Sequence, residues 1–337
     1  MKTTPTIIAV VCLLTALAGC NGKVGTIQPP GPGKELLTVD FQQDQILRYK
    51  FVSTRKIIRD WGATGEAAEK SGAKPDTFHD AMEMIVAYQP VEVNPYGLTK
   101  VKVSIESIEV KRSQDTGQRP KNSKDAIKTL AGKSYTLNVQ PNGSIEDYSE
   151  LDRLIKQAGE KAFRRNSRQG RIKEPDMIGD FVAAQWFLWD SISSIEKPAK
   201  GVSVGQTWQS KLSIPAPFVM LKARNVDYTL AEIRQTEKGR LAVIKGSYSP
   251  ADTRPKDWPV PYTGSFQTSG RFGLFRRFKI LQLKGSGTEL FNIDKGRVEQ
   301  STQNYRMEVS ASLLFPLPGT NPHVTVDQKL TMQLLGG

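Results

Sequence analysis

The sequence predicts a β-rich α+β protein, in which two antiparallel β units are joined by a segment of two helices. Three observations support this fold class. Apolar and polar residues alternate over 101–105, which is typical of a strand with one face in water. Apolar residues recur every three or four positions over 148–192, as in helices. Alternation returns after residue 204 and continues to the end of the chain.

The first 19 residues have the order of a secretory signal and are excluded from the predicted fold. Lys2 supplies a positive charge, and the mostly apolar stretch 7–14 follows. This stretch is too short to cross a bilayer as a permanent helix. Small residues then lead into a cysteine in the run Leu17-Ala18-Gly19-Cys20.

Leu17-Ala18-Gly19-Cys20 resembles the lipobox of bacterial lipoproteins. The resemblance implies cleavage before Cys20, a diacylglycerol on the Cys20 thiol, and an acyl group such as palmitate on the new N-terminus. In that family an Asp after the cysteine commonly marks retention in the inner membrane. Asn21 stands here instead, so the resemblance implies the outer membrane, with the body facing the periplasm. The alternatives are a plain secreted protein or an uncleaved anchor.

Composition narrows the expected chemistry and partners. Cys12 and Cys20 are the two cysteines, so a processed and lipidated chain would keep no free thiol. Disulfides, cysteine-based metal sites and thiol nucleophiles are therefore excluded. The formal net charge of +13 suggests an anionic partner. Because the export signal argues against nucleic acid, the expected partners are the membrane, through the anchor, and anionic lipid or an acidic envelope polymer. The alternative is ordinary solvated lysines.

Residues 20–35 are expected to be a flexible tether, because Gly and Pro are dense over 21–34. The first β unit is expected over 36–143, with a hairpin turn at Asn94-Pro95-Tyr96-Gly97 and a bulge near Ser107. Its predicted strands are 46–52, 84–93, 101–105 and 135–139.

The helical segment is expected over 144–200. One amphipathic helix begins near Tyr148, and a second opens at Pro175-Asp176 and runs to Ile192. We expect Trp186 and Trp189 on the second helix to be core residues. The arginine-rich loop over 164–173 either binds an acidic polymer or is simply solvated.

The second β unit is expected over 201–337. Its predicted strands are 207–214, 226–233, 241–248, 264–275, 278–283, 288–293, 298–314 and 324–334. Short motifs recur in both units: Leu137-Asn138-Val139 and Phe291-Asn292-Ile293 are each followed by a Gly turn. An internal duplication is therefore a hypothesis.

The arrangement is similar to an uncharacterised family of β-rich bacterial envelope lipoproteins. The similarity rests on Gly205-Gln206-Thr207-Trp208 and on the Gly turns at Asn142-Gly143 and Lys295-Gly296. It implies no catalytic residue. The expected layout, a curved sheet with helices across one face, also resembles the half-barrel carriers of lipoproteins and lipids, although fold analogy is poor support for function.

No catalytic residue, cofactor or metal site is predicted. The string Asp76, His79, Asp80 and Glu83 would place His79 and Glu83 on one helical face, but we interpret these residues as solvated. His323 is interpreted as a loop residue. The sequence contains no H-E-x-x-H, G-x-S-x-G or P-loop motif, which weakens an enzymatic hypothesis.

Phenylalanines and cations interleave over 266–279 and form the predicted ligand site. Outside the cytoplasm this pattern suits an anionic lipid or glycolipid. The alternative is a strand pair with Phe pointing inward and cations outward. The candidate residues are Arg271, Phe272, Phe275, Arg276 and Arg277.

The sequence therefore predicts a non-enzymatic envelope lipoprotein that binds a lipid, glycan or protein partner through a sheet face or groove. It predicts an apolar concavity flanked by Arg271, Arg276 or Arg277. The alternative is a structural or assembly lipoprotein with a filled core and an exposed flat patch, and a hydrolase is the third hypothesis.

Overall fold

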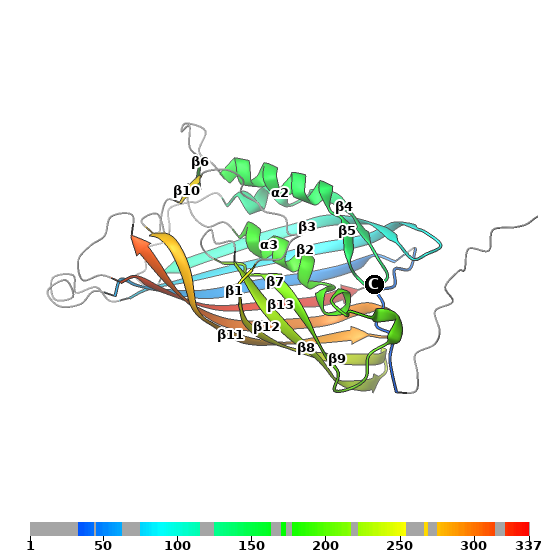
Figure 1. The fold of residues 1–337 in the computed structure, drawn as a ribbon. Helices are drawn as coiled ribbons and strands as arrows, with labels where there is room; N and C mark the ends of the chain where they lie inside the picture. Colours follow the sequence, from blue (N-terminus) through cyan, green and yellow to red (C-terminus); the bar gives the residue numbers. More distant parts are fainter. Residues whose placement is uncertain are drawn as a thin grey trace, which may run out of the picture.

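The computed structural model describes residues 33–43, 45–62, 75–114, 125–162, 170–172, 177–216, 222–253, 266–268, 275–313 and 321–336. Its main feature is one eleven-stranded antiparallel sheet, with helices lying across one face (Figure 1). The order of the strands is β5-β4-β3-β2-β1-β13-β12-β11-β9-β8-β7. The prediction of a β-rich fold with antiparallel strands and a helical segment is confirmed.

The first half of the sheet is a meander of neighbouring strands. Asn94 shapes the predicted turn, since its Oδ1 accepts hydrogen bonds from the backbone N–H groups of Tyr96 and Leu98, each at 2.9 Å. The predicted bulge is also present, because the register shifts between Ile85 and Val86 and leaves Glu106 as the extra residue. The strands are β1 (Leu47–Asp60), β2 (Asp76–Val93), β3 (Thr99–Gln114), β4 (Ser134–Val139) and β5 (Ile145–Asp147).

The second half contains longer strands than the sequence predicted. In particular, residues 278–283 and 288–293 belong to a single strand, β11. The short strands β6 (Gly170–Ile172) and β10 (Phe266–Thr268) form a separate parallel pair. The remaining strands are β7 (Thr207–Ser213), β8 (Ala223–Thr236), β9 (Gly239–Ala251), β11 (Phe275–Asn292), β12 (Arg297–Leu313) and β13 (His323–Gly336).

The two predicted β units share one sheet, because β1 pairs with β13 along its whole length. This pairing runs from Arg48 opposite Gly336 to Asp60 opposite His323. The first and last strands of the sheet therefore lie side by side at its centre. The internal duplication stays a prediction.

The second predicted helix is two helices, α3 (Ile178–Phe187) and α4 (Asp190–Ser193), interrupted at Leu188-Trp189. It was predicted to have one apolar face, but α3 is buried on nearly every side, including Asp180 and Gln185. The sheet curves around α3, so even its polar positions meet protein. Trp189 is buried, as expected, and Trp186 packs against Tyr148.

The remaining helical segments of the described residues are one α-helix and two short 3₁₀ turns. α2 (Ser149–Ala162) confirms the first predicted helix. Short 3₁₀ turns, η1 (Ala126–Leu130) and η2 (Pro198–Lys200), connect neighbouring elements. None of the described helices is long and apolar enough to cross a membrane.

The segment that follows the predicted tether packs against one end of the sheet. Val39 N donates a hydrogen bond to Pro141 O at 2.7 Å, and Asp40 N donates one to Gly296 O at 2.9 Å. Leu37 and Phe41 are buried in the core. The chain therefore enters the fold beside the β4–β5 and β11–β12 turns.

Candidate functional site: a basic groove on the open face of the sheet

The predicted phenylalanine and arginine site is only partly within the described residues. Phe275 is a core residue with 2% of its surface exposed, and its ring lies 5.3 Å from that of Trp61. Arg277 is exposed, with a backbone φ of 46°. This pair follows the alternative interpretation, with Phe inward and the cation outward. Arg271, Phe272 and the side chain of Arg276 lie outside the described residues, as do Leu17, Ala18, Gly19 and Cys20.

The helical arrangement of His79 and Glu83 does not occur, because both residues lie on strand β2, and the interpretation of the string as solvated is wrong for Asp80. Successive side chains of a strand point to opposite faces, so His79 is exposed while Asp80 is buried. Within the described part of the chain, no group of three or more His, Cys, Asp or Glu residues is placed to hold a metal ion.

The described residues do line a wide hollow, which lies on the face of the sheet opposite the helices. It has a volume of about 810 Å³ and extends over six adjacent strands, β3, β2, β1, β13, β12 and β11. At the usual separation of strands its length across the sheet is roughly 24 Å. We call this hollow the basic groove.

The strand register arranges the outward side chains of the basic groove in two parallel rows. Each residue stands directly opposite the next one on the neighbouring strand. The first row is Ser113, His79, Lys56, Asp327, Arg306 and Lys284. The second row is Lys111, Ala81, Thr54, Lys329, Asn304 and Ser286.

Positive charge dominates these rows. Arg306 forms ion pairs with Asp327 at 3.5 Å and with Glu308 at 3.3 Å. Among the described residues, the four lysines of the groove form no ion pair; they are Lys56, Lys111, Lys284 and Lys329. Lys284 stands directly opposite Arg306, and like charges in that position repel each other. A bound anion would relieve this repulsion, so the groove suits an anionic ligand.

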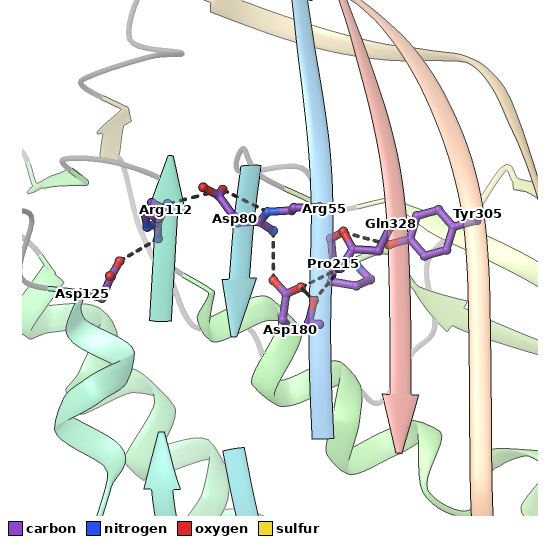
Figure 2. A network of polar contacts seen from close by, with 9 residues as sticks. Arg55, Asp80, Arg112, Asp125, Asp180, Pro215, Tyr305 and Gln328 are labelled. Carbon is purple, nitrogen blue, oxygen red and sulfur yellow. Dashed lines mark hydrogen bonds and ion pairs between the residues drawn. The ribbon is translucent and has the colours of Figure 1, made fainter. Parts of the chain in front are cut away.

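A buried polar network lies directly beneath the basic groove (Figure 2). Arg55 joins Asp80 of β2 at 3.2 Å and Asp180 of α3 at 3.0 Å. Asp180 also accepts hydrogen bonds from Ser53 Oγ at 2.6 Å and Gln328 Nε2 at 2.9 Å. Along β1, β2 and β13, the buried residues Arg55, Asp80 and Gln328 alternate with the outward residues of the groove. The network therefore fixes the strands that carry the groove cations.

Arg112 extends the network to the edge of the groove. Its guanidinium lies 2.6 Å from Asp125 and 3.5 Å from Asp80. On the other side of the network, Tyr305 Oη donates a hydrogen bond to Pro215 O at 3.0 Å. The connected ion pairs and hydrogen bonds thus span from β3 to β13 under the hollow, and the Tyr305 hydrogen bond lies on the next strand, β12.

The space between the sheet and α3 is filled. The cavity lined by Phe51, Asp180, Phe187 and Met332 has a volume of about 20 Å³, which is room for a single water molecule. An acyl chain would not fit there. Neither this cavity nor the basic groove is lined by Phe275 or Arg277, so the apolar concavity predicted beside those residues corresponds to neither.

Polar side chains also fill the interior of the second half. Arg224 is fully buried, with its guanidinium 4.3 Å from the ring centre of Tyr248 and 4.9 Å from that of Tyr305. Glu289 is buried and accepts a hydrogen bond from Ser191 Oγ. Burial raises the pKa of Glu289 to about 8, despite the opposing effect of this hydrogen bond.

Sequence reasoning missed the basic groove because its five cations are scattered over five strands. A local signal did exist, because Lys56, Lys111 and Lys329 each occupy a polar position in a strand whose apolar and polar residues alternate. However, only the register shows that these lysines converge, and pairing between β1 and β13 is not visible in local sequence.

Comparisons with known proteins are sparse. The model of a family of unknown function, DUF6263, matches residues 95–247, which is less than half of the chain. No curated protein sequence matches the chain.

Two solved structures show partial similarity. One, described as lipid–protein interactions in lipovitellin, is 9% identical with a TM-score of 0.45, over 88% of this chain and 26% of that chain. This chain thus spans about a quarter of the length of that lipovitellin chain. The other, OpdQ of Pseudomonas aeruginosa, is 8% identical with a TM-score of 0.20, over 87% of this chain and 99% of that chain. At these TM-scores neither similarity bears on function.

Proposed function

We propose that this protein is a lipid-anchored lipoprotein of the bacterial envelope that binds an extended anionic polymer in the basic groove. The proposal depends on the two parallel rows of side chains, which direct five cations and one carboxylate into one hollow of about 810 Å³. Charge of one sign concentrated in a concave surface attracts ligands of the opposite sign.

The shape of the groove favours a polymer over a compact anion. A length of roughly 24 Å across six strands exceeds what a single phosphate or carboxylate group can contact. Thr54, Ser113, Ser286 and Asn304 add hydrogen-bonding groups between the cations. An acidic glycan, with charges and hydroxyl groups along its length, matches this mixture.

Two observations argue against an acyl chain as the ligand. Most groove residues carry polar or charged side chains, the exceptions being Ala81, Gly285 and the ring of Tyr305. The interior cavity of about 20 Å³ is too small for an acyl chain. An anionic lipid would therefore interact through its headgroup alone, so vesicles form a separate arm of the test.

The polymer proposal is tested by fluorescence anisotropy with labelled galacturonate oligomers of graded length. Affinity should rise with length until the oligomer spans the groove and then level off. Neutral maltose oligomers of the same lengths are the control ligand. Equal binding of both oligomers would overturn the proposal, and binding only to anionic phospholipid vesicles would assign the groove to lipid headgroups.

Substitutions at two groove lysines test whether the oligomer binds in the groove. Lys56→Gln with Lys329→Gln removes two unpaired charges. At about 0.5–1 kcal/mol for each exposed charge pair, binding should weaken roughly 5- to 30-fold. Lys238→Gln with Lys245→Gln removes the same charge from exposed sites outside the groove. If the two double variants bind the oligomer equally, the effect is one of net charge and the groove is not the site.

The lipid anchor rests on the sequence Leu17-Ala18-Gly19-Cys20 and on the signal before it. More than one acyl chain would make attachment to the membrane stable. Metabolic labelling with radioactive palmitate tests the anchor, and Cys20→Ser should abolish both the label and sedimentation with membranes. A labelled Cys20→Ser protein would contradict it.

A further inference from the structure

Among the described residues, four exposed apolar side chains lie at one end of the sheet. Three of them belong to the tip of the β2–β3 hairpin: Val91 is 47% exposed, Val93 is 42% exposed and Tyr96 is 85% exposed. Leu335, which is 49% exposed, lies on β13 at the same end, since its neighbour Gly336 pairs with Arg48 at the start of β1. We call Val91, Val93 and Tyr96 the apolar tip.

The chain enters the fold next to the apolar tip. Gly97 of the hairpin turn lies against Pro141, so closely that an added Cβ would stand 2.6 Å from the proline Cγ. The carbonyl oxygen of Pro141 accepts the hydrogen bond from Val39 N. A continuous set of contacts therefore connects the hairpin to the segment that follows residue 33.

The segment between Cys20 and the described body is short. Residues 20–34 are rich in Gly and Pro, and a stretch of 15 residues reaches at most about 50 Å. A lipid on Cys20 would thus hold the apolar tip within reach of the bilayer surface. Tyr suits such a position, because its ring is apolar and its hydroxyl stays in contact with water.

We propose that the apolar tip of the β2–β3 hairpin inserts into the interface of the bilayer that holds the lipid anchor. The proposal rests on the proposed lipidation of Cys20. It adds a second point of contact, which orients the body so that the sheet stands on the membrane by its hairpin end. In that orientation the basic groove is held away from the bilayer, since Lys56 lies about 30 Å along β1 from Leu47.

The test uses the full lipidated chain in phosphatidylcholine vesicles, which carry no net charge and so do not recruit the basic groove. Because Cys20 carries the lipid and no other cysteine follows it, one added cysteine takes an environment-sensitive dye selectively. Tyr96→Cys places the dye at the apolar tip, and Val93→Cys provides a second position. We expect the emission of both to shift to the blue, and acyl-brominated lipid to quench it.

Leu281→Cys is the matched control. Leu281 is also an exposed apolar residue, at 49%, but lies on β11 away from the hairpin end. A dye at position 281 should show the emission typical of an aqueous environment both with and without vesicles. Dyes at 93 and 96 that behave like the dye at 281, in protein that sediments with the vesicles, would overturn the membrane contact while leaving the lipid anchor intact. Protein that fails to sediment would contradict the anchor itself.

A second copy of the chain is the other candidate occupant of the apolar tip. If the dye at position 96 shifts in detergent solution, and the shift grows with protein concentration, the tip is a self-association surface. That result would also overturn the proposal.

Discussion

The residue that most directly ties stability to pH is Glu289, whose buried carboxyl group has its pKa raised to about 8. An unfolded chain ionises this group near pH 4.5, whereas the folded chain keeps it protonated. The free energy of unfolding should therefore fall as the pH rises from about 4.5 to about 8, by up to roughly 1.4 kcal/mol per pH unit. Below and above this window Glu289 contributes no slope.

Glu289→Gln should remove that slope, because the amide has the shape of the protonated acid and does not titrate. Urea unfolding at pH 5 and pH 8 measures the change. Relative to the natural protein, the variant should gain stability at pH 8 and little at pH 5. Glu237→Gln, at an exposed turn, is the control and should change stability equally at both values. A gain of equal size at both pH values for Glu289→Gln would contradict the expectation.

Asp180 is the residue on which the buried network beneath the basic groove depends. It accepts hydrogen bonds from Ser53, Arg55 and Gln328, from two different strands. Asp180→Ala should cost about 3–5 kcal/mol in the free energy of unfolding, because it leaves the buried Arg55 with only part of its partners. Asp152→Ala, which breaks the exposed pair with Lys156, should cost about 0.5 kcal/mol or less. Comparable losses in the two variants would show that the buried network is not specially important.

At the scale of the elements, the sequence predicted what depends on local pattern. Alternation identified the strands, and Asn94 and Gly97 identified the hairpin turn. Two predictions failed for a tertiary reason. Separate strands were predicted over 278–283 and 288–293, yet β11 continues through Gly285 and Gly287, which lie where Tyr305 and Tyr248 approach the strand. One apolar face was predicted for the helix α3, yet the strands also supply hydrogen-bond partners to its buried polar residues Asp180 and Gln185.

Gly97 tests the geometry of the hairpin. Its φ of 84° is in the left-handed region, and Pro141 leaves no room for a Cβ. Gly97→Ala should lower the free energy of unfolding by about 1–3 kcal/mol. Gly132→Ala has a similar φ of 76° with open space around it, so it measures the backbone strain alone. Thermal unfolding that finds the same loss in both would show that the contact with Pro141 is unimportant.

For the whole molecule, the site could not be derived from the sequence, because the basic groove exists only where six strands from both halves align. Since its cations are exposed, polymer binding should depend strongly on salt. Anisotropy titrations at rising sodium chloride should show a steady loss of affinity, and Lys56→Gln with Lys329→Gln should reduce the steepness of that loss. Binding that is insensitive to salt would contradict an electrostatic site.

The pairing of β1 with β13 has a consequence for how this protein acquires its structure. A chain that emerges N-terminus first exposes the open edge of β1 until the last strand of the sheet has appeared. The β1–β2–β3 meander can form early, but the inner face beneath α3 cannot be sealed before residues 323–336 arrive. Contacts between such distant segments slow folding, and an open strand edge invites pairing with other chains. Protection of the unfinished molecule by a chaperone would therefore matter most until β13 has been synthesised.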